Sequence, residues 1–368
     1  MGKILIYPFT VESFPLCEYI PVFLPNYQVS ALATPPGSGV VEKDAAHISN
    51  RFPIGLIVQK DLDNALEKCD AVLVPFGDLN SDPMFYNAYE VMCKAAKNKK
   101  EIFCASRLSA AQIKYLNILD TFHYGLKEES TYLYKTVYGE YQPSVPVVFV
   151  HNLTMEADSF EVTLSLAQRF RRDGYRVSIV GARPEYTFLG FNASALLIDF
   201  FYGNYKLSRI TEGMHLFQHY LHHIESIQNP DIILLNFPGG AVSTQDIYPN
   251  ERGVFTYIMT QSIRPDFSVV CMTNGNISLD GFSLIDLGLK EHFGIGADAF
   301  HISNHFVHIE QARLAKKERG YYSHVQETID QIQRIRKNSD NEFPIFSAMI
   351  EEEKESLYQT LLMRLTQE

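Results

Sequence analysis

The residues with the clearest chemical potential lie in one short stretch, from Asn152 to Ser159. This stretch has the length of a phosphate-binding loop, which reads Gly, four residues, Gly, Lys and then Ser or Thr. Here Asn152 and Ala157 stand in place of the glycines, and Asp158 stands in place of the lysine that neutralises the phosphates. A carboxylate repels a nearby phosphate by about 1 kcal/mol or more per close charge pair, even in water. We therefore expect no cofactor, disfavoured binding of nucleotide or Mg²⁺, and no ATP hydrolysis at an enzyme-like rate.

The elements around this loop are predicted to be a strand, a helix and a second strand. Residues 147–150 form a short β-branched run that is typical of a buried parallel strand. Apolar residues then recur at helical spacing over 160–170, and a second strand is predicted over 176–180. In this arrangement Asp158 or Ser159 would cap the helix, whatever else the loop does.

Polar and small side chains follow the other strands predicted in this half of the chain. Apolar strands are expected over 231–237 and 267–272. The carboxyl ends of parallel strands share one edge of a sheet, and ligands bind there. We expect a ligand site suited to a polar peptide or small molecule, made by His151, Asn152, Thr154, Glu156, Asp158, Ser159, Arg183, Asn236, Gly239, Gly240, Thr273 and Asn274.

The order of these motifs resembles a known class of phosphate-binding proteins. The strand DIILLNF over 231–237, followed by Pro-Gly-Gly, is similar to the Walker B end of the dethiobiotin synthetase and cobyrinic acid amidase class. The resemblance covers roughly residues 147–308. It implies a degenerate P-loop-like α/β fold, kept as a scaffold or for another ligand.

The first part of the chain is predicted to be a flavodoxin- or Rossmann-like α/β domain. Short apolar strands alternate with helical patterns, which predicts a doubly wound parallel sheet. The predicted strands cover 3–9, 29–34, 54–58, 71–75 and 101–105, and the predicted helices cover 14–24, 62–68, 82–97 and 109–119.

A cleft is expected at the carboxyl ends of these strands as well. The first strand-to-helix turn lacks the Gly-x-Gly-x-x-Gly pattern, so a dinucleotide is not indicated. Gly37 and Gly39 could bind phosphate, but a tight turn is the simpler interpretation. The candidate cleft residues are Tyr7, Thr10, Gly37, Gly39, Asp78 and Ser106.

Several phrases in this first part resemble a second family. The stretches GKILIYPF, SALATPPGSG, EKDA and LEKCDAVLV are similar to accessory proteins of clostridial peptide maturation systems. Those proteins are encoded beside a radical S-adenosylmethionine maturase and a short Cys-rich precursor peptide. The resemblance implies a role in making a ribosomally synthesised natural product, with the precursor peptide or the maturase as partner. It supplies no catalytic residues.

A polar, Tyr-rich stretch over 127–146 suggests a domain boundary. We expect domains at 1–143 and 144–308, followed by a helical extension over 309–368 with charged helices at 309–337 and 351–366. Leu357, Leu361 and Leu365 share one face of the last helix, which could dock onto the body or form a homodimer or partner contact.

Two groups of histidines offer an alternative chemistry. His215, His219 and His222 are spaced along one face of a helix expected over 211–227, opposite its apolar stripe, and they should face solvent or a partner. His301 and His305 lie near a predicted strand. A zinc site needs three or four converging ligands, and the spacing on one helix supplies two. A His-ligated metallohydrolase therefore remains one alternative, beside an ATP- and Mg-dependent ligase or amidase-like enzyme.

Composition limits the other classes. The net charge is −11 over 368 residues, which argues against nucleic acid or an anionic membrane surface as partner. The five cysteines form no C-x-x-C pair, and we expect a reducing, cytoplasmic location. No apolar run approaches the roughly 20 residues of a membrane span.

Overall fold

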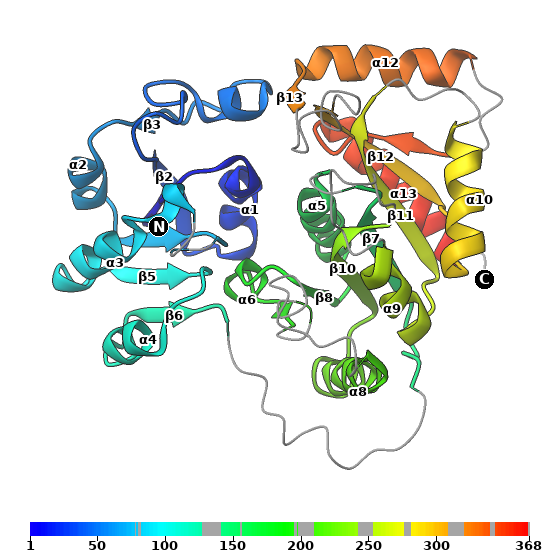
Figure 1. Cartoon of the computed structure of the whole chain (residues 1–368), viewed down its shortest axis with the longest axis horizontal. Coiled ribbons are helices and arrows are strands. Elements are labelled where there is room, and N and C mark those ends of the chain that lie inside the picture. The colour runs from blue at the N-terminus through cyan, green and yellow to red at the C-terminus, as the bar shows by residue number, and fades with distance from the viewer. Residues whose placement is uncertain are drawn as a thin grey trace. The chain divides into compact units, whose positions relative to one another are not determined.

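The computed structural model describes residues 1–77, 79, 82–126, 141–154, 157–194, 197, 210–241, 253–275, 281–307, 320–338 and 343–366 (Figure 1). The chain divides into two compact units: the first comprises Met1–Glu129 and Arg183–Ala195, and the second comprises Ser130–Ala182 and Leu196–Glu368. The division expected from the sequence differs in that the first unit includes a later segment and the last helices belong to the second unit. Asp78 and Glu156, two predicted site residues, lie outside the described residues.

The first unit contains a fully parallel sheet, which confirms the predicted fold class. Its strands run in the order β3-β2-β1-β4-β5-β6. This is the strand order of dinucleotide-binding α/β domains, in which the order reverses between β1 and β4. The strands are β1 (Gly2–Ile6), β2 (Tyr27–Ala33), β3 (Val58–Gln59), β4 (Ala71–Val74), β5 (Glu101–Cys104) and β6 (Phe122–Tyr124).

Three helices of the first unit pack on one apolar core, and a fourth follows β1. Ala65 of α2, Met92 of α3 and Leu116 of α4 are buried in the same cluster as Val72 and Ile102 of the sheet. Burying such side chains stabilises the unit by roughly 1.5–3 kcal/mol for each large residue. The helices are α1 (Pro15–Phe23), α2 (Leu62–Glu67), α3 (Ala88–Lys97) and α4 (Ala110–Leu116).

Three local predictions for this unit are corrected. The strand expected over 54–58 joins the sheet only from Val58 as β3, because Ile54 and Ile57 are exposed and Ile57 pairs instead with Asp44 in an isolated antiparallel bridge. The helix expected over 82–97 begins at Ala88, because Asp82 caps a separate 3-10 turn. The short strand β6 was not predicted.

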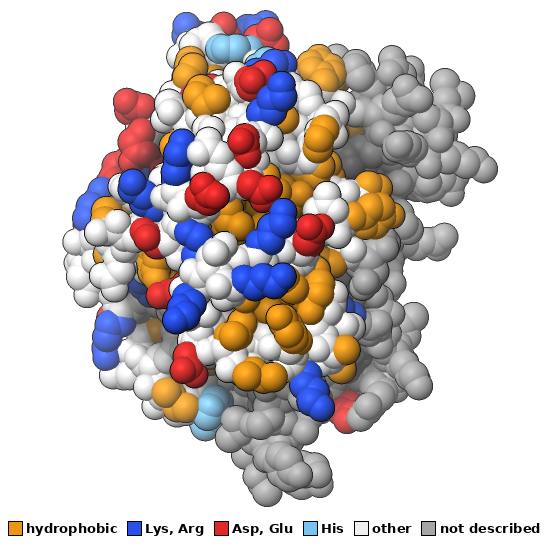
Figure 2. All heavy atoms as spheres, turned by 90° about the vertical axis from the view of Figure 1, so that its left-hand side faces the viewer, with side chains coloured by type: hydrophobic (Ala, Val, Ile, Leu, Met, Phe, Trp, Pro, Cys, Tyr) orange, Lys and Arg blue, Asp and Glu red, His pale blue; other side chains and the backbone are white. Residues whose placement is uncertain are grey.

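Acidic and basic side chains are mixed over the face of this unit shown in Figure 2, in keeping with ion pairs such as Lys94 to Asp63 at 3.0 Å.

The second unit contains a mostly parallel sheet whose central strands run β12-β11-β7-β10-β8. At its edge β13 pairs antiparallel with β12, and β14 adds in parallel to β12. The strands are β7 (Val147–Asn152), β8 (Val177–Gly181), β10 (Ile232–Gly240), β11 (Phe267–Asn274), β12 (Ala299–Val307), β13 (Gly320–Tyr322) and β14 (Ile345–Phe346).

Helices cover both faces of this sheet. Figure 1 shows α5 and α13 on one face and α9 and α10 on the other. Residues 309–319 of the charged helix expected over 309–337 lie outside the described residues. In the described part, Tyr321 and Tyr322 stack on strand β12 and extend the sheet as β13, and α12 begins at Val325, so the expected helix is not continuous. No helix among the described residues is long and apolar enough to cross a membrane. The helices are α5 (Ser159–Arg172), α8 (Ile210–Gln228), α9 (Val254–Ser262), α10 (Gly281–Phe293), α12 (Val325–Asn338) and α13 (Glu351–Thr366).

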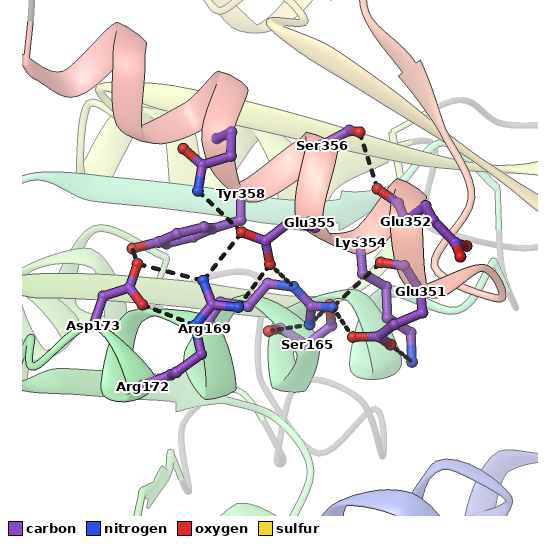
Figure 3. A network of polar contacts seen from close by, with 11 residues as sticks. Ser165, Arg169, Arg172, Asp173, Glu351, Glu352, Lys354, Glu355, Ser356 and Tyr358 are labelled. Carbon is purple, nitrogen blue, oxygen red and sulfur yellow. Dashed lines mark hydrogen bonds and ion pairs between the residues drawn. The ribbon is translucent and has the colours of Figure 1, made fainter.

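A polar network fixes the C-terminal helix α13 to α5, the helix that follows the predicted loop (Figure 3). Arg169 is only 2% exposed and forms ion pairs with Glu351 and, at 3.2 Å, with Glu355. Leu357 and Leu361 of α13 are buried. The last helix therefore docks onto its own unit through the face that the sequence marked as apolar.

Candidate functional site

The loop that follows β7 begins beside the carboxyl end of β10 and beside residues within β11 and β12. Asn152 pairs in register with Gly240 of β10 on one side and with Cys271 of β11 on the other. Cys271 in turn pairs with His301 of β12. The Leu153 amide donates to the Cys271 carbonyl at 2.7 Å, which fixes the start of the loop on the sheet. The expected edge is thus formed by adjacent strands.

Asp158, which stands at the position of the phosphate-binding lysine, is paired with a histidine. It is the N-cap of α5, and its φ of 62° lies in the left-handed region, which Asp tolerates better than most residues. Its carboxylate makes no capping bond to the described first turn of α5. Instead its Oδ2 lies 3.3 Å from Nε2 of His301. The predicted capping position is correct, but the side chain has another partner.

The proton position on His301 follows from its second nitrogen. The Ala348 amide donates to Nδ1 of His301 at 3.0 Å, so Nδ1 carries no proton. Nε2 must then carry the proton and donate it to Asp158. His301 is 0% exposed. The buried histidine therefore orients a half-buried carboxylate where a phosphate site would present a cation.

Cys271 beside this pair could suggest a Cys-His-Asp nucleophile, but the geometry excludes it. Both ring nitrogens of His301 are committed, one to Ala348 and one to Asp158, so neither can take the thiol proton. Burial, and then the charge of Asp158, raise the pKa of the Cys271 thiol well above its ordinary value. A protonated thiol is a poor nucleophile, so this cysteine serves the core.

His151 is a neutral core residue. It is 0% exposed, and burial lowers its pKa to about 4. Its Nε2 lies 3.1 Å from the Ser268 hydroxyl, and its ring stacks on Phe237 with centroids 5.3 Å apart. At neutral pH it carries no charge, so it cannot act as a cation toward a ligand.

Hydrogen-bond acceptors without partners gather around the loop. In the described part of the chain, the buried oxygens Oδ1 of Asn152, Oγ1 of Thr154 and Oδ1 of Asn274 have no hydrogen-bond partner. Leaving a buried acceptor unpaired costs about 1–3 kcal/mol, so these atoms favour an occupant that donates hydrogen bonds. The Asn236 amide group instead donates to the Val150 carbonyl at 3.0 Å and holds two strands together.

The remaining predicted residues of this edge have mixed positions. Ser159 is buried at the start of α5, and Thr273 is half-buried at the end of β11. Gly239 and Gly240 lie within β10. Arg183 follows the end of β8 by two residues and is assigned to the first unit, where its Nη2 pairs with Glu185 at 2.8 Å.

The cleft residues predicted in the first unit are mostly committed to the fold. Tyr7 is buried, and Ser106 donates its hydroxyl to the Pro75 carbonyl. Thr10 accepts a hydrogen bond from the Ser13 hydroxyl at 2.9 Å through its carbonyl. Gly37 and Gly39 have φ values of 95° and 78°, which only glycine adopts readily, and their side-chain positions are open. The turn interpretation fits their geometry.

The histidine sets have different surroundings. His215 and His222 are exposed on α8, but His219 is 9% exposed, so the prediction that all three face away from the core is wrong. The buried face of α8 is wider than its apolar stripe and includes Gln218, which donates to the Ser262 carbonyl. His305 stacks on Tyr322. The described residues contain no group of three or more His, Cys, Asp or Glu placed to hold a metal ion.

Comparison with known proteins bears on the fold. No family model matches the chain, and no curated protein matches it. A DUF1611 family protein from Anabaena variabilis is similar in structure, with a TM-score of 0.60 and 10% identity over 99% of this chain and 100% of that chain. At this identity the likeness shows a shared fold alone. A GTPase from Pyrococcus abyssi gives a TM-score of 0.31 at 15% identity, over 60% of this chain and 97% of that one, which is too low to carry an argument.

Proposed function

We propose that the second unit is a non-hydrolysing scaffold that binds a polar, hydrogen-bond-donating ligand at the carboxyl edge of its sheet. The observation that carries this proposal is the Asp158–His301 pair at the position of the phosphate-binding lysine. An oriented carboxylate there repels the β- and γ-phosphates that a lysine would attract. The loop has the position of a phosphate-binding loop, but Asp158 gives it a negative charge where such a loop has a positively charged lysine.

The unpartnered oxygens indicate the chemistry of the ligand. Asn152 and Asn274 present amide oxygens that only accept, Thr154 presents a hydroxyl that both accepts and donates, and Asp158 adds a carboxylate. Peptide N–H groups, side-chain amides and ammonium groups supply the matching donors. A peptide therefore suits this edge better than a nucleotide, whose phosphates bring only acceptors.

The resemblance of the first part of the chain supplies the biological setting. We propose that the ligand is the precursor peptide of a ribosomally synthesised natural product, or its radical S-adenosylmethionine maturase, and that this protein acts as their accessory. The acceptor-rich edge supports a peptide partner without identifying it.

Calorimetric titration tests the proposal with two ligands, Mg·ATP and the Cys-rich precursor peptide encoded near the gene. We expect heat of binding with the peptide and none with Mg·ATP. Asn152→Leu removes one acceptor and should weaken peptide binding about tenfold, since a hydrogen bond contributes about 1 kcal/mol or more. Gln333→Leu, on the exposed side of α12, is the matched amide-to-leucine control. Binding of Mg·ATP with turnover that Ser159→Ala abolishes would overturn the proposal.

A further inference from the structure

The strand order of the first unit marks the place where a ligand crevice is expected, which we call the switch-point crevice. In open parallel sheets, ligands bind outside the carboxyl ends of the strands where the strand order reverses. Here the reversal lies between β1 and β4. The backbone amide of Phe76, two residues beyond β4, faces this position.

A carboxylate from the chain itself occupies the switch-point crevice. Glu185, in the short helix α6 (Glu185–Phe188), is 0% exposed. Its Oε1 accepts hydrogen bonds from the Phe76 amide at 2.9 Å and from Nη2 of Arg183 at 2.8 Å. Burial raises the pKa of the Cys104 thiol to about 12. The charge of Glu185 also raises this pKa, and a hydrogen bond to the backbone of Ser106 lowers it. Glu185 therefore lies near the carboxyl ends of both β4 and β5.

The segment that carries Glu185 is packed as part of the first unit. The Thr187 hydroxyl donates to the Gly125 carbonyl at 3.2 Å, just beyond β6. The Phe188 ring packs edge-on against Phe103 of β5, with centroids 5.5 Å apart. A Cβ at Gly125 would lie 2.8 Å from the Pro184 carbonyl oxygen, so glycine is needed for this close approach. The segment ends at β9 (Asn192–Ala193).

We propose that the switch-point crevice is a carboxylate-binding site and that the chain fills it with its own Glu185. A backbone amide and a guanidinium that share one carboxylate oxygen form the donor set that proteins use for carboxylate ligands. The intact protein is then closed to external ligands at this position. Once the Glu185 side chain is removed, the site takes a small monocarboxylate. This inference is independent of the function proposed for the second unit.

The test is chemical rescue of Glu185→Ala in the full-length protein, followed by thermal unfolding. The substitution removes the buried carboxylate that pairs with Arg183 and should lower Tm by about 10 °C, even though Glu12 also acts on Arg183 electrostatically. Sodium acetate should then raise the Tm of the variant, because a ligand that binds only the folded state stabilises it. We expect this rise to be several-fold larger than that of wild type or of Glu67→Ala, an exposed matched control.

Two further comparisons identify the carboxylate as the cause. Sodium chloride at equal ionic strength and neutral acetamide should leave Tm of Glu185→Ala unchanged. Glu185→Gln, whose amide fills the space, should not respond to acetate. An equal acetate response in wild type and Glu185→Ala, or no response in either, would overturn the proposal. If Glu185→Ala does not fold in chloride, recovery in acetate supports the site, and equal failure in both salts overturns it.

Discussion

The contribution of the Asp158–His301 hydrogen bond to stability can be measured by replacing Asp158 with Asn, which exchanges one carboxylate oxygen for an amide nitrogen. Asp158→Asn removes the charge but keeps an acceptor, and Asn tolerates the left-handed backbone at φ 62° as well as Asp does. The donor, Nε2 of His301, lies 3.3 Å from the carboxylate. A hydrogen bond to a charged group contributes about 1.5–3 kcal/mol and a neutral one about 1 kcal/mol. We therefore expect Asp158→Asn to lower the free energy of unfolding by about 1 kcal/mol.

Asp158→Ala should cost more, for two reasons. The side chain of His301 is 1% exposed, so its Nε2–H would be left buried without an acceptor, at about 1–3 kcal/mol. Alanine also pays about 1 kcal/mol for the left-handed backbone. The expected loss is about 3 kcal/mol.

Urea unfolding of both variants, with Asp330→Asn on the exposed side of α12 as control, measures these values. Equal losses for Asp158→Asn and Asp158→Ala would refute the reasoning, because the acceptor would then contribute nothing. A loss in Asp330→Asn as large as that in Asp158→Asn would point to general charge effects instead.

Three more outcomes are expected. Replacing both Glu351 and Glu355 with Gln should lower the free energy of unfolding by about 3–5 kcal/mol, more than the sum of the single changes, because the buried arginine on α5 would lose both counter-charges (Figure 3); a double-mutant cycle measures this. The pKa of His151 in the folded state, about 4, lies below its unfolded value of 6.5. The unfolded state therefore binds more protons between these two pH values, and the free energy of unfolding should fall by about 3 kcal/mol as the pH drops from 6.5 to 4. His151→Phe should flatten that pH profile in urea titrations. A fragment ending at residue 143 should melt below the first unit of the whole chain, and the peptide 183–195 should raise its Tm; equal melting would show that the segment is dispensable.

Local patterns predicted much of this fold. The β-branched run of β7 and the helical spacing after Asp158 specify their own strand and helix, because each signal lies within a few residues. Strand β6 was missed because it is only three residues long, so the alternation of Phe122, His123 and Tyr124 is too short to stand out from the surrounding sequence. The strand expected before Val58 was wrong because its apolar residues suggested a buried strand, whereas in the structure Ile54 and Ile57 are exposed.

The candidate site was predictable in its place and not in its contacts. Strand ends and the loop frame located the edge around Asn152, because parallel strands must end on one side. The partner of Asp158 lies 143 residues away on β12, and no local signal connects them. The same limit applies to Arg183, whose carboxylate partner Glu185 also accepts a hydrogen bond from Phe76, 109 residues away in sequence.

The discontinuity of the first unit has a consequence for synthesis on the ribosome. Its sheet is complete once β6 has emerged, but Arg183–Ala195 is made only after the first strands of the second unit. At typical rates the interval lasts roughly 3–13 s. During that time Phe103 and the Phe76 amide lack their final cover, so a nascent first unit exposes apolar surface to chaperones and proteases. Translation speed between residues 129 and 195 thus becomes a determinant of how much protein reaches the folded state.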